Sequence, residues 1–351
     1  MTDTGAHNKA ALGLLRAAQY DWDTPALAAA LHGVMAPDAA LHLCHPIGDL
    51  TGPEALLTRA LTPLRTALPD AERRDWIVIE GSDAEGQHWV GCAGHYVGTF
   101  VAPFLDIPPT GHLAHMRFHE FYRFQDGKIV EMQAIWDLPE LMMQAGAWPM
   151  APALGRELCV PGPASGDGLH RAPRDPQLSA QSCQLVIDML DHMIRHPAQG
   201  GPEVMELPRF WHDTMTWYGP AGIGTARGIA GFRNWHQIPF LSAMPDRGQH
   251  PEGLRFHFFG DNAYAAVTGW PNMRQTLSGG GWLGLPPTGQ QITLRSLDFW
   301  RIEAGKIREN WVLVDLLDLY QQLGVDVLAR MREFNKARVP GHVPFSAGDA
   351  E

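Results

Sequence analysis

Two stretches of this 351-residue chain carry closely related sequences, and they decide how its fold is interpreted. Residues 108–146 read PPTGHLAHMRFHEFYRFQDGKIVEMQAIWDLPELMMQAG, and residues 286–324 read PPTGQQITLRSLDFWRIEAGKIRENWVLVDLLDLYQQLG. Without any gap, 16 of the 39 positions are identical, whereas unrelated sequences would share roughly two or three. The chain is therefore predicted to contain two homologous units of ordinary domain size.

The amino-acid composition changes between the two units. Residues 147–178 are rich in proline and glycine and poor in large apolar side chains, which is typical of an extended linker or a surface strap. We therefore assign residues 1–146 to the first unit and residues 179–335 to the second unit. Residues 336–351 are expected to form a loose C-terminal tail.

In each unit, helical periodicity comes first and strand-like alternation follows. The clearest strands form two predicted hairpins, 118–124 with 129–136 and 294–302 with 307–314. The first hairpin turns at Asp126-Gly127, a strong signal for a two-residue loop. Helices followed by an antiparallel meander indicate an α+β fold.

The turn also predicts which side chains share a face, because side chains alternate with period two. Counting outward from each turn without insertions gives one mixed face of acids and aromatics per hairpin. The predicted faces are Asp137, Ile135, Gln133, Glu131, Tyr122, Glu120, Phe118 and Met116 in the first unit, and Asp315, Leu313, Trp311, Glu309, Trp300, Asp298, Ser296 and Leu294 in the second. Such a face is either a solvated outer surface or a pocket wall, where burial raises an acid's pKa towards neutrality.

The opposite face of the second hairpin is apolar and carries Leu297, Phe299, Val312 and Val314. A face of this kind needs cover, so the two units are expected to pair through their sheets as an internal pseudo-dimer. Further homo-oligomerisation stays open. In the same unit, Trp217, Tyr218, Trp235 and His236 are expected either to line a pocket mouth or to pack in the core.

The repeated motif resembles that of the SnoaL-like polyketide cyclases, which belong to the nuclear-transport-factor-2-like superfamily. In the second unit the resemblance rests on Leu285–Gly289, Asp298–Arg301, Gly305–Ile307, Glu309–Trp311 and Asp315, followed by Gln321–Gly324. The first unit matches over Ile107–Gly111, Phe121–Arg123, Asp126–Ile129, Glu131, Asp137 and Gln144–Gly146. The resemblance implies two cone-shaped units, each a curved antiparallel sheet wrapped around N-terminal helices.

The resemblance further implies an intramolecular aldol ring closure, or an isomerisation, of a polyketide-like ester by an aspartate acting as general acid and base. By motif position this aspartate is Asp315 or Asp137. The second unit keeps the family's Trp311, where the first unit has Gln133, so Asp315 ranks first. The predicted substrate-binding residues are Trp311, Trp300, Asp298, Glu309, Leu313, Tyr122, Glu120, Gln133 and Phe118. No cofactor is implied.

Two other functions remain open at this stage. A hydrolase of the epoxide-hydrolase type would use an aspartate to activate water, and it would need an arginine and a second carboxylate around that water. A non-catalytic module would bind a small molecule in an apolar pocket without organised polar groups.

Composition excludes several classes of partner. The net charge of −11 argues against nucleic acid and anionic membranes, and no run of about 18 apolar residues occurs. The expected partner is a small apolar carbonyl compound, and the expected location is cytoplasmic. Four scattered cysteines indicate neither a disulfide framework nor a zinc motif. No metal ligands are assigned, but the first unit is rich in histidine, including His95, His112, His115 and His119, and metal binding there stays open.

Overall fold

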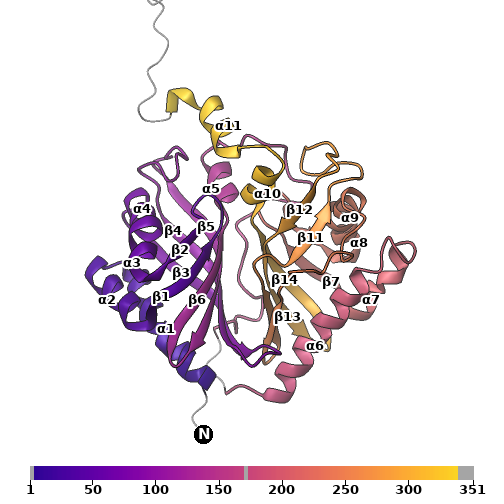
Figure 1. The fold of residues 1–351 in the computed structure, drawn as a ribbon, viewed down its shortest axis with the longest axis horizontal. Coiled ribbons are helices and arrows are strands. Elements are labelled where there is room, and N and C mark those ends of the chain that lie inside the picture. Colours follow the sequence, from indigo (N-terminus) through magenta and orange to yellow (C-terminus); the bar gives the residue numbers. More distant parts are fainter. Residues whose placement is uncertain (1–3, 170–172, 339–351) are drawn as a thin grey trace, which may run out of the picture.

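The computed structural model describes residues 4–169 and 173–338, which form two halves of the same architecture (Figure 1). The first half contains α1 (Thr4–Asp21), α2 (Thr24–Val34), β1 (Met35–Leu43), β2 (Asp49–Thr51), α3 (Gly52–Leu56), a π-helical turn (Leu57–Leu61), α4 (Thr62–Ala67), β3 (Glu72–Ser82), β4 (His88–Thr99), β5 (Leu113–Gln125), β6 (Lys128–Trp136) and α5 (Leu138–Gln144).

The second half follows a similar order, with additional strands and a further C-terminal helix. It contains α6 (Pro176–Met193), a 3₁₀ turn (Pro202–Met205), α7 (Leu207–Phe210), β7 (Trp211–Tyr218), β8 (Ala226–Arg227), α8 (Gly228–Phe232), a π-helical turn (Arg233–Gln237), α9 (Ile238–Ala243), β9 (His257–Asp261), β10 (Tyr264–Thr268), β11 (Met273–Thr276), β12 (Gln291–Leu294), β13 (Ser296–Glu303), β14 (Lys306–Val314), α10 (Leu316–Gln322) and α11 (Val327–Phe334). A 3₁₀ turn at Lys336–Arg338 follows, and the rest of the expected tail lies outside the described residues.

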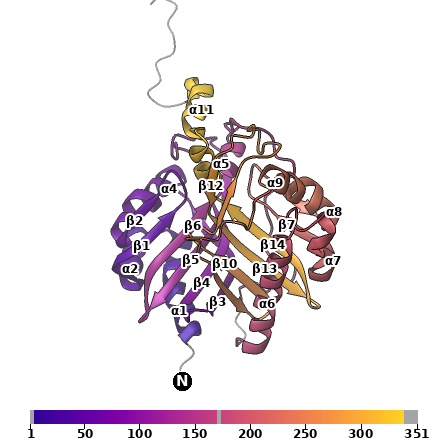
Figure 2. The same ribbon diagram turned by 45° about the vertical axis from the view of Figure 1, so that its right-hand side comes forward.

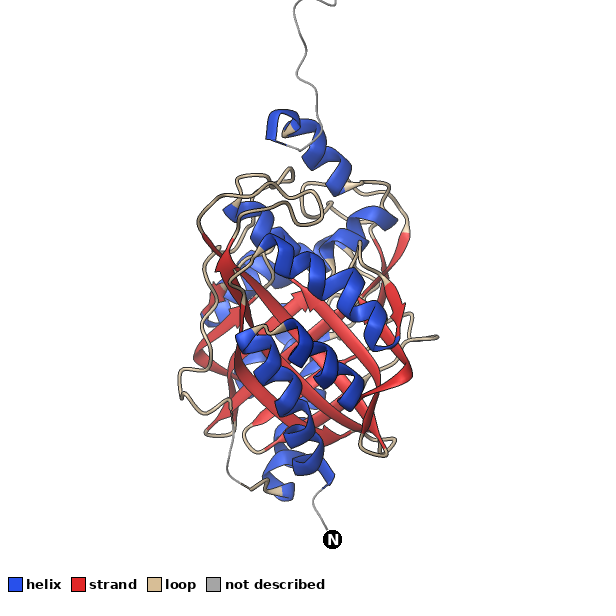
Figure 3. Ribbon diagram, turned by 90° about the vertical axis from the view of Figure 1, so that its left-hand side faces the viewer, coloured by secondary structure: helices blue, strands red, loops and turns tan. Residues whose placement is uncertain are grey.

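Each half is built on a six-stranded sheet. The strand orders are β2-β1-β6-β5-β4-β3 and β8-β7-β14-β13-β10-β9, and β11 pairs with β12 as a separate ribbon. All neighbouring strands are antiparallel except β1 with β6 and β7 with β14, which run parallel. The N-terminal helices lie over one face of each sheet (Figure 3). The predicted α+β class and the two-unit arrangement are thereby confirmed.

Local sequence explains where several elements begin. Asp175 caps α6, because its carboxylate accepts hydrogen bonds from the backbone N–H groups of Gln177 at 2.9 Å and Leu178 at 3.1 Å. Pro176 occupies the first turn, where its missing N–H costs nothing. In the described residues, no helix combines the length and the apolar character needed to cross a bilayer.

Both predicted hairpins are present, and each contains one irregularity that the sequence count omitted. Asp126 and Gly127 both have positive φ (49° and 75°), as a tight hairpin turn requires. Beyond the turn, the register shifts by one residue: Phe124 pairs with Ile129, but Arg123 pairs with Glu131. A β-bulge of this kind reverses which face every later residue occupies.

The two sheets face each other across the centre of the molecule, and the helices lie outside them (Figures 1 and 2). We call this sheet–sheet contact the seam. Phe121 stacks on Phe299 with ring centroids 4.9 Å apart, and the Nδ1–H of His119 donates to the carbonyl oxygen of Leu297 over 2.6 Å. Leu297 and Phe299 therefore contribute to the seam as expected. The bulge turns the other two predicted seam residues, Val312 and Val314, to the opposite face of the sheet.

The segment between the halves runs along the seam as a strap. Arg156 and Thr225 exchange backbone hydrogen bonds of 2.8 and 2.9 Å. Further on, the indole N–H of Trp311 donates to the carbonyl oxygen of Pro161 over 2.9 Å. Both contacts hold this part of the strap against the second half.

Candidate functional site

The bulge in the second hairpin decides which residues can form a pocket. Ile302 pairs with Ile307, but Arg301 pairs with Glu309, so Arg308 is the inserted residue. Asp298 and Trp300 consequently lie opposite Val312 and Asn310, on the face that looks towards the helices. The predicted common face with Asp315 is wrong. Trp311, Leu313 and Glu309 lie on the reverse face of the sheet, which forms the seam.

The same correction applies to the first hairpin. Glu120 pairs with Ala134, Tyr122 pairs with Met132, and Phe118 pairs with Trp136. These side chains face the helices, whereas Gln133 and Asp137 face the seam. His119 pairs with Ile135 and therefore lies on the same face as Asp137. One inserted residue exchanges the two faces.

The helix-side face of the second sheet lines an inner chamber with a volume of about 80 Å³. Its wall is mainly aromatic and aliphatic, with a few polar side chains. The chamber is lined by Met189, Leu190, Met193, Trp211, Trp217, Ile223, Phe232, His236, Phe240, Arg247, Met273, Trp282, Leu294, Ser296, Asp298, Trp300, Asn310, Val312 and Val314. Apolar clefts or cavities with a few polar groups are the usual form of small-molecule sites.

An outer groove of about 280 Å³ adjoins this chamber. The groove runs between α6, the loop 247–256 and the strands β10 and β11, and Phe256 lies on its wall. Both hollows share the same five lining residues, Leu190, Arg247, Met273, Ser296 and Asp298. The Asp298 carboxylate therefore borders both hollows.

The surroundings of Asp298 give its carboxyl group a pKa suited to proton transfer. The Ser296 hydroxyl donates to its Oδ1 over 2.6 Å. Burial disfavours the charged form and raises the pKa of Asp298 to about 7, although the Ser296 hydrogen bond and the positive charge of Arg247 act in the opposite direction. A carboxyl group with a pKa near neutrality can both take up and return a proton under physiological conditions.

Several polar atoms around the chamber have no partner in the described part of the chain. They include Nε and Nη1 of Arg247, Nδ1 of His236, and the indole nitrogens of Trp211 and Trp300. Burial lowers the pKa of Arg247 to about 10, which leaves it charged at neutral pH. Because buried polar groups are normally hydrogen-bonded, these atoms indicate a ligand with oxygen acceptors.

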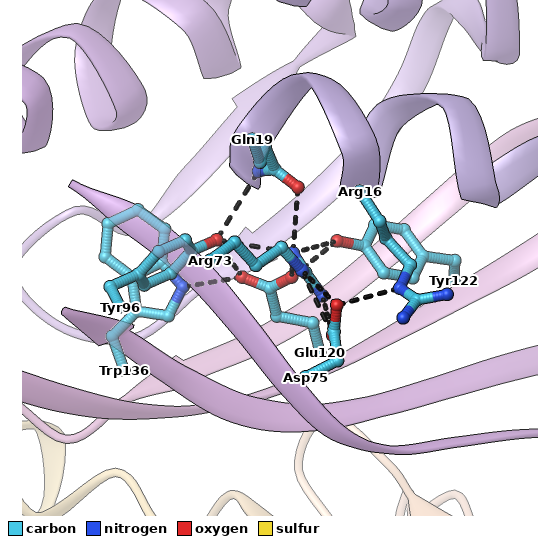
Figure 4. A network of polar contacts seen from close by, with 8 residues as sticks. All are labelled: Arg16, Gln19, Arg73, Asp75, Tyr96, Glu120, Tyr122 and Trp136. Atoms are coloured by element: carbon cyan, nitrogen blue, oxygen red, sulfur yellow. Dashed lines mark hydrogen bonds and ion pairs between the residues drawn. The ribbon is translucent and has the colours of Figure 1, made fainter. Parts of the chain in front are cut away.

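The equivalent region of the first unit is filled with side chains. Glu120, which aligns with Asp298 at a shift of 178, is fully buried. Its Oε1 accepts hydrogen bonds from the Tyr96 hydroxyl and the Trp136 indole, both at 2.9 Å. Its Oε2 accepts a 2.5 Å hydrogen bond from the Tyr122 hydroxyl (Figure 4).

Arg73 completes this network from β3, two strands away from Glu120 in the sheet. Its guanidinium group contacts Glu120 Oε2 at 2.5 Å and Asp75 at 3.0 Å, and it donates to Gln19 Oε1 over 2.9 Å (Figure 4). The predicted ligand contact Phe118 lies under the guanidinium, 4.3 Å from ring centroid to Cζ. Glu120, Tyr122 and Phe118 therefore form a satisfied polar core in the first unit, with each carboxylate oxygen of Glu120 already paired.

Asp137 and Asp315 occupy corresponding places at the seam, each at the N-terminus of the helix that follows its sheet. Asp137 accepts hydrogen bonds from Arg117 at 3.3 Å and from the backbone N–H of Ala221, in the other unit, at 3.0 Å. Asp315 accepts hydrogen bonds from Arg295 at 3.1 Å and from the backbone N–H of His45 at 2.9 Å.

Burial raises the pKa of Asp137 to about 7 and that of Asp315 to about 6. A raised pKa alone therefore does not distinguish these two carboxyl groups from Asp298. What distinguishes them is access: neither Asp137 nor Asp315 is among the residues that line the chamber or the groove.

The other predicted contacts also lie at the seam. Trp311 stacks on Tyr218 with centroids 5.5 Å apart and packs against Trp76 of the first unit. The Thr268 hydroxyl donates to Gln133 Oε1 across the seam over 2.6 Å. Glu309 pairs with the Arg301 guanidinium at 2.5 Å. Leu313 is fully buried on the same face.

Of the predicted ligand-binding residues, the structure brings Asp298 and Trp300 into the chamber. It adds Arg247, which follows α9 in a loop and carried no signal in the sequence. Trp217 and His236, which the sequence left undecided, stack at 3.9 Å and line the chamber, whereas Trp235 is exposed.

The family model of the SnoaL-like polyketide cyclases matches this chain twice, over residues 14–145 and 202–323. The chain belongs to the SnoaL-like polyketide cyclase family. Each match covers one six-stranded sheet, so the internal duplication is a duplication of the SnoaL-like unit. No curated protein matches the chain significantly in sequence.

Several solved structures resemble parts of this SnoaL-like chain. IdmH, a candidate polyketide cyclase from Streptomyces antibioticus, is 25% identical with a TM-score of 0.34, over 40% of this chain and 98% of IdmH. AclR, a candidate hydroxylase from Streptomyces galilaeus, is 22% identical with a TM-score of 0.35, over 42% and 85% of the two chains. A candidate SnoaL-like polyketide cyclase from Jannaschia sp. CCS1 is 19% identical with a TM-score of 0.35, over 41% and 94%.

Proposed function

We propose that the second unit catalyses ring closure or isomerisation of a small, largely apolar carbonyl compound, with Asp298 as general acid and base. The observation that carries this proposal is the position of Asp298, whose carboxylate borders both the groove and the chamber and has a pKa of about 7. The aromatic wall of the chamber supplies apolar contact for the body of the ligand.

The proposed reaction begins when the Asp298 carboxylate removes a proton from the carbon beside a carbonyl group. The electron pair of the broken C–H bond forms an enolate, whose negative oxygen is stabilised by Arg247. In ring closure, the enolate carbon attacks a second carbonyl of the same molecule. The resulting alkoxide takes the proton back from Asp298, which restores the carboxylate. In isomerisation, Asp298 returns the proton to another carbon of the enolate system.

Both residues fit these roles without forming a fixed ion pair. In the described part of the chain, no ion pair within 4.0 Å joins Arg247 to Asp298 or to another acid. The guanidinium atoms Nε and Nη1 are therefore available to a ligand oxygen. Holding two reacting carbonyl groups together in one cavity contributes to the rate through orientation, in addition to proton transfer.

The first unit supports the fold of this enzyme rather than its chemistry. At the position of Asp298 it has Glu120, and both oxygens of that carboxylate are occupied by Arg73 and three ring donors. A proton acceptor with saturated lone pairs, away from a cavity, does not reach a substrate.

A hydrolase and a plain binding module are less consistent with the chamber. A hydrolytic site needs a second carboxylate on the attacking water, and among the described residues that line the chamber Asp298 is the only acid. A plain apolar binding pocket does not require an acid with a pKa near 7 beside an unpartnered guanidinium group. The expected chemistry is therefore proton transfer at carbon.

Exchange of carbon-bound hydrogen tests this proposal directly. Phenylacetone and 2-tetralone are incubated with the protein in D₂O, and loss of the signals of the protons beside the carbonyl is followed by proton NMR. The wild-type chain is expected to accelerate exchange, and Asp298→Asn is expected to lower that acceleration by roughly 10²–10⁴-fold. Asp213→Asn, which removes an exposed acid of the same unit, is the matched control.

Unchanged exchange in folded Asp298→Asn protein would exclude Asp298 as the base. If Asp315→Asn lost exchange activity and Asp298→Asn kept it, the base would be Asp315 at the seam.

A further inference from the structure

A second cluster of reactive side chains lies in the first unit, outside the chamber and the groove. His95 on β4, His115 on β5 and Cys159 on the strap place one nitrogen or sulfur atom each within 4.8 Å of one another. The two histidines are diagonal neighbours, because His95 pairs with Arg117 and His115 pairs with Val97 in the β4–β5 ladder. They therefore project from the same face of the sheet, towards the strap.

The donor atoms of this cluster are those that zinc prefers. Two imidazole nitrogens and one thiolate form a common three-residue ligand set, with water in the fourth position. Ligand atoms around a tetrahedral zinc ion lie about 3.3–3.6 Å apart, given Zn–N near 2.0 Å and Zn–S near 2.3 Å. The ligand atoms of His95, His115 and Cys159 lie at most 4.8 Å apart. Shifts of only about 1 Å would bring them to the separations found around zinc.

Neighbouring residues contact both imidazole rings. Nδ1 of His115 lies 3.2 Å from Glu140 Oε1 but makes no hydrogen bond in the described residues, so a metal on Nε2 would leave the Nδ1–H group facing this carboxylate. A carboxylate behind a ligating histidine is the usual outer support of a zinc site. His95 is buried and accepts a hydrogen bond at Nδ1 from the Trp76 indole over 3.2 Å. Its Nε2 has no partner among the described residues.

Binding through His95 Nε2 has one cost. The ring proton then resides on Nδ1, so the Trp76 indole must give up its hydrogen bond. One neutral hydrogen bond contributes little compared with the bonds that a structural zinc ion forms. The indole N–H of Trp76 therefore reports on binding.

The third proposed ligand, Cys159, lies on a part of the strap that is held by hydrogen bonds. Cys159 lies between Arg156, which is bonded to Thr225, and Pro161, which accepts the indole N–H of Trp311. Its exposed side chain leaves one side of the cluster open to solvent. These contacts to the second unit fix the strap on both sides of Cys159.

We propose that His95, His115 and Cys159 form a site for Zn²⁺ or a similar divalent transition metal, which fastens the strap to the first sheet beside the seam. The site is separate from the proposed chemistry at Asp298. Its histidines belong to the first unit and its cysteine to the strap, and all three are distinct from the residues that line the chamber.

Cobalt(II) titration of the full-length chain, after dialysis against EDTA, tests this site. We expect one Co²⁺ per chain, with a thiolate-to-cobalt charge-transfer band and the visible bands of tetrahedral cobalt, both reversed by Zn²⁺. Cys159→Ser should lose the charge-transfer band, and Glu140→Gln should weaken binding roughly 10–100-fold. The ¹⁵N-edited NMR signal of the Trp76 indole should shift in the wild-type chain.

Matched controls separate this cluster from other cysteines and histidines. Cys183→Ser and His112→Ala, which remove residues outside the cluster, should bind cobalt as the wild type does. Asp298→Asn should also bind cobalt normally, so failure of the proposed reaction and failure of this site give different results. Absence of cobalt bands in the wild type, or an unchanged charge-transfer band in Cys159→Ser, would overturn the proposal.

Discussion

Glu120 and Asp298 occupy equivalent positions on β5 and β13, but only Asp298 borders a cavity. The difference arises from their neighbours. Arg73, Tyr96, Tyr122 and the Trp136 indole surround Glu120, whereas Asp298 is hydrogen-bonded by Ser296 and faces open space. The two copies of one fold thus use the same carboxylate position for structure in one unit and, in our proposal, for chemistry in the other.

The rate of the proposed proton abstraction should depend on pH through Asp298. The carboxylate is the active base and its pKa is about 7, so the rate should rise about tenfold per pH unit below 7 and level off above it. Arg247→Met removes a positive charge that lowers this pKa, so the inflection should move to higher pH. The pH profile of exchange in both proteins is the measurement, with Arg247→Lys as the conservative variant. An inflection that is identical in all three proteins would contradict the assignment.

Asp298→Asn should make the protein more stable at alkaline pH. The folded-state pKa of about 7 lies above the ordinary value of 3.8, so ionisation of Asp298 opposes folding. The penalty develops as pH rises from about 4 to 7 and is complete above that range. Because the side chain is only half-buried, we expect a gain of roughly 1–3 kcal/mol at pH 8 and none at pH 4. Urea unfolding at both pH values checks this, and Asp213→Asn should show no such difference.

Glu120→Gln should destabilise the first unit strongly. It removes a charge from a fully buried ion pair with Arg73, a change that typically costs about 3–5 kcal/mol. Glu72→Gln breaks the exposed pair with Arg74 and should cost only about 0–1 kcal/mol. Chemical denaturation of both variants provides the comparison. Equal losses would mean that the network does not hold the first unit together.

Asp315→Ala should lower stability while leaving exchange catalysis in the folded fraction near the wild-type level. The substitution removes the cap of α10 and leaves the backbone N–H of His45 without its acceptor, which together should cost roughly 1–3 kcal/mol. Thermal unfolding and exchange rates per folded molecule are measured on the same sample. If catalysis falls by a hundredfold in folded protein, the seam carboxylate takes part in the reaction.

Sequence comparison within the chain was sufficient for much of the architecture. The 39-residue repeat revealed two units, the turn at Asp126-Gly127 predicted its hairpin, and the combined motif indicated the SnoaL-like family. These features could be predicted because turn chemistry and side-chain alternation depend on residues that are close together in the sequence. Asp298 and Trp300 were also among the residues expected to contact a ligand, although for a reason that involved the wrong register.

Only the tertiary structure decided which acid meets a cavity. One bulged residue in each hairpin, Val130 and Arg308, reverses the faces beyond it, and alternation alone cannot reveal an inserted residue. Arg247 approaches Asp298 from a distant loop, and Cys159 reaches His95 and His115 from the strap. Contacts between segments far apart in the chain depend on how complete elements pack. The sequence therefore determined the two units and their hairpins, and packing determined where chemistry can occur.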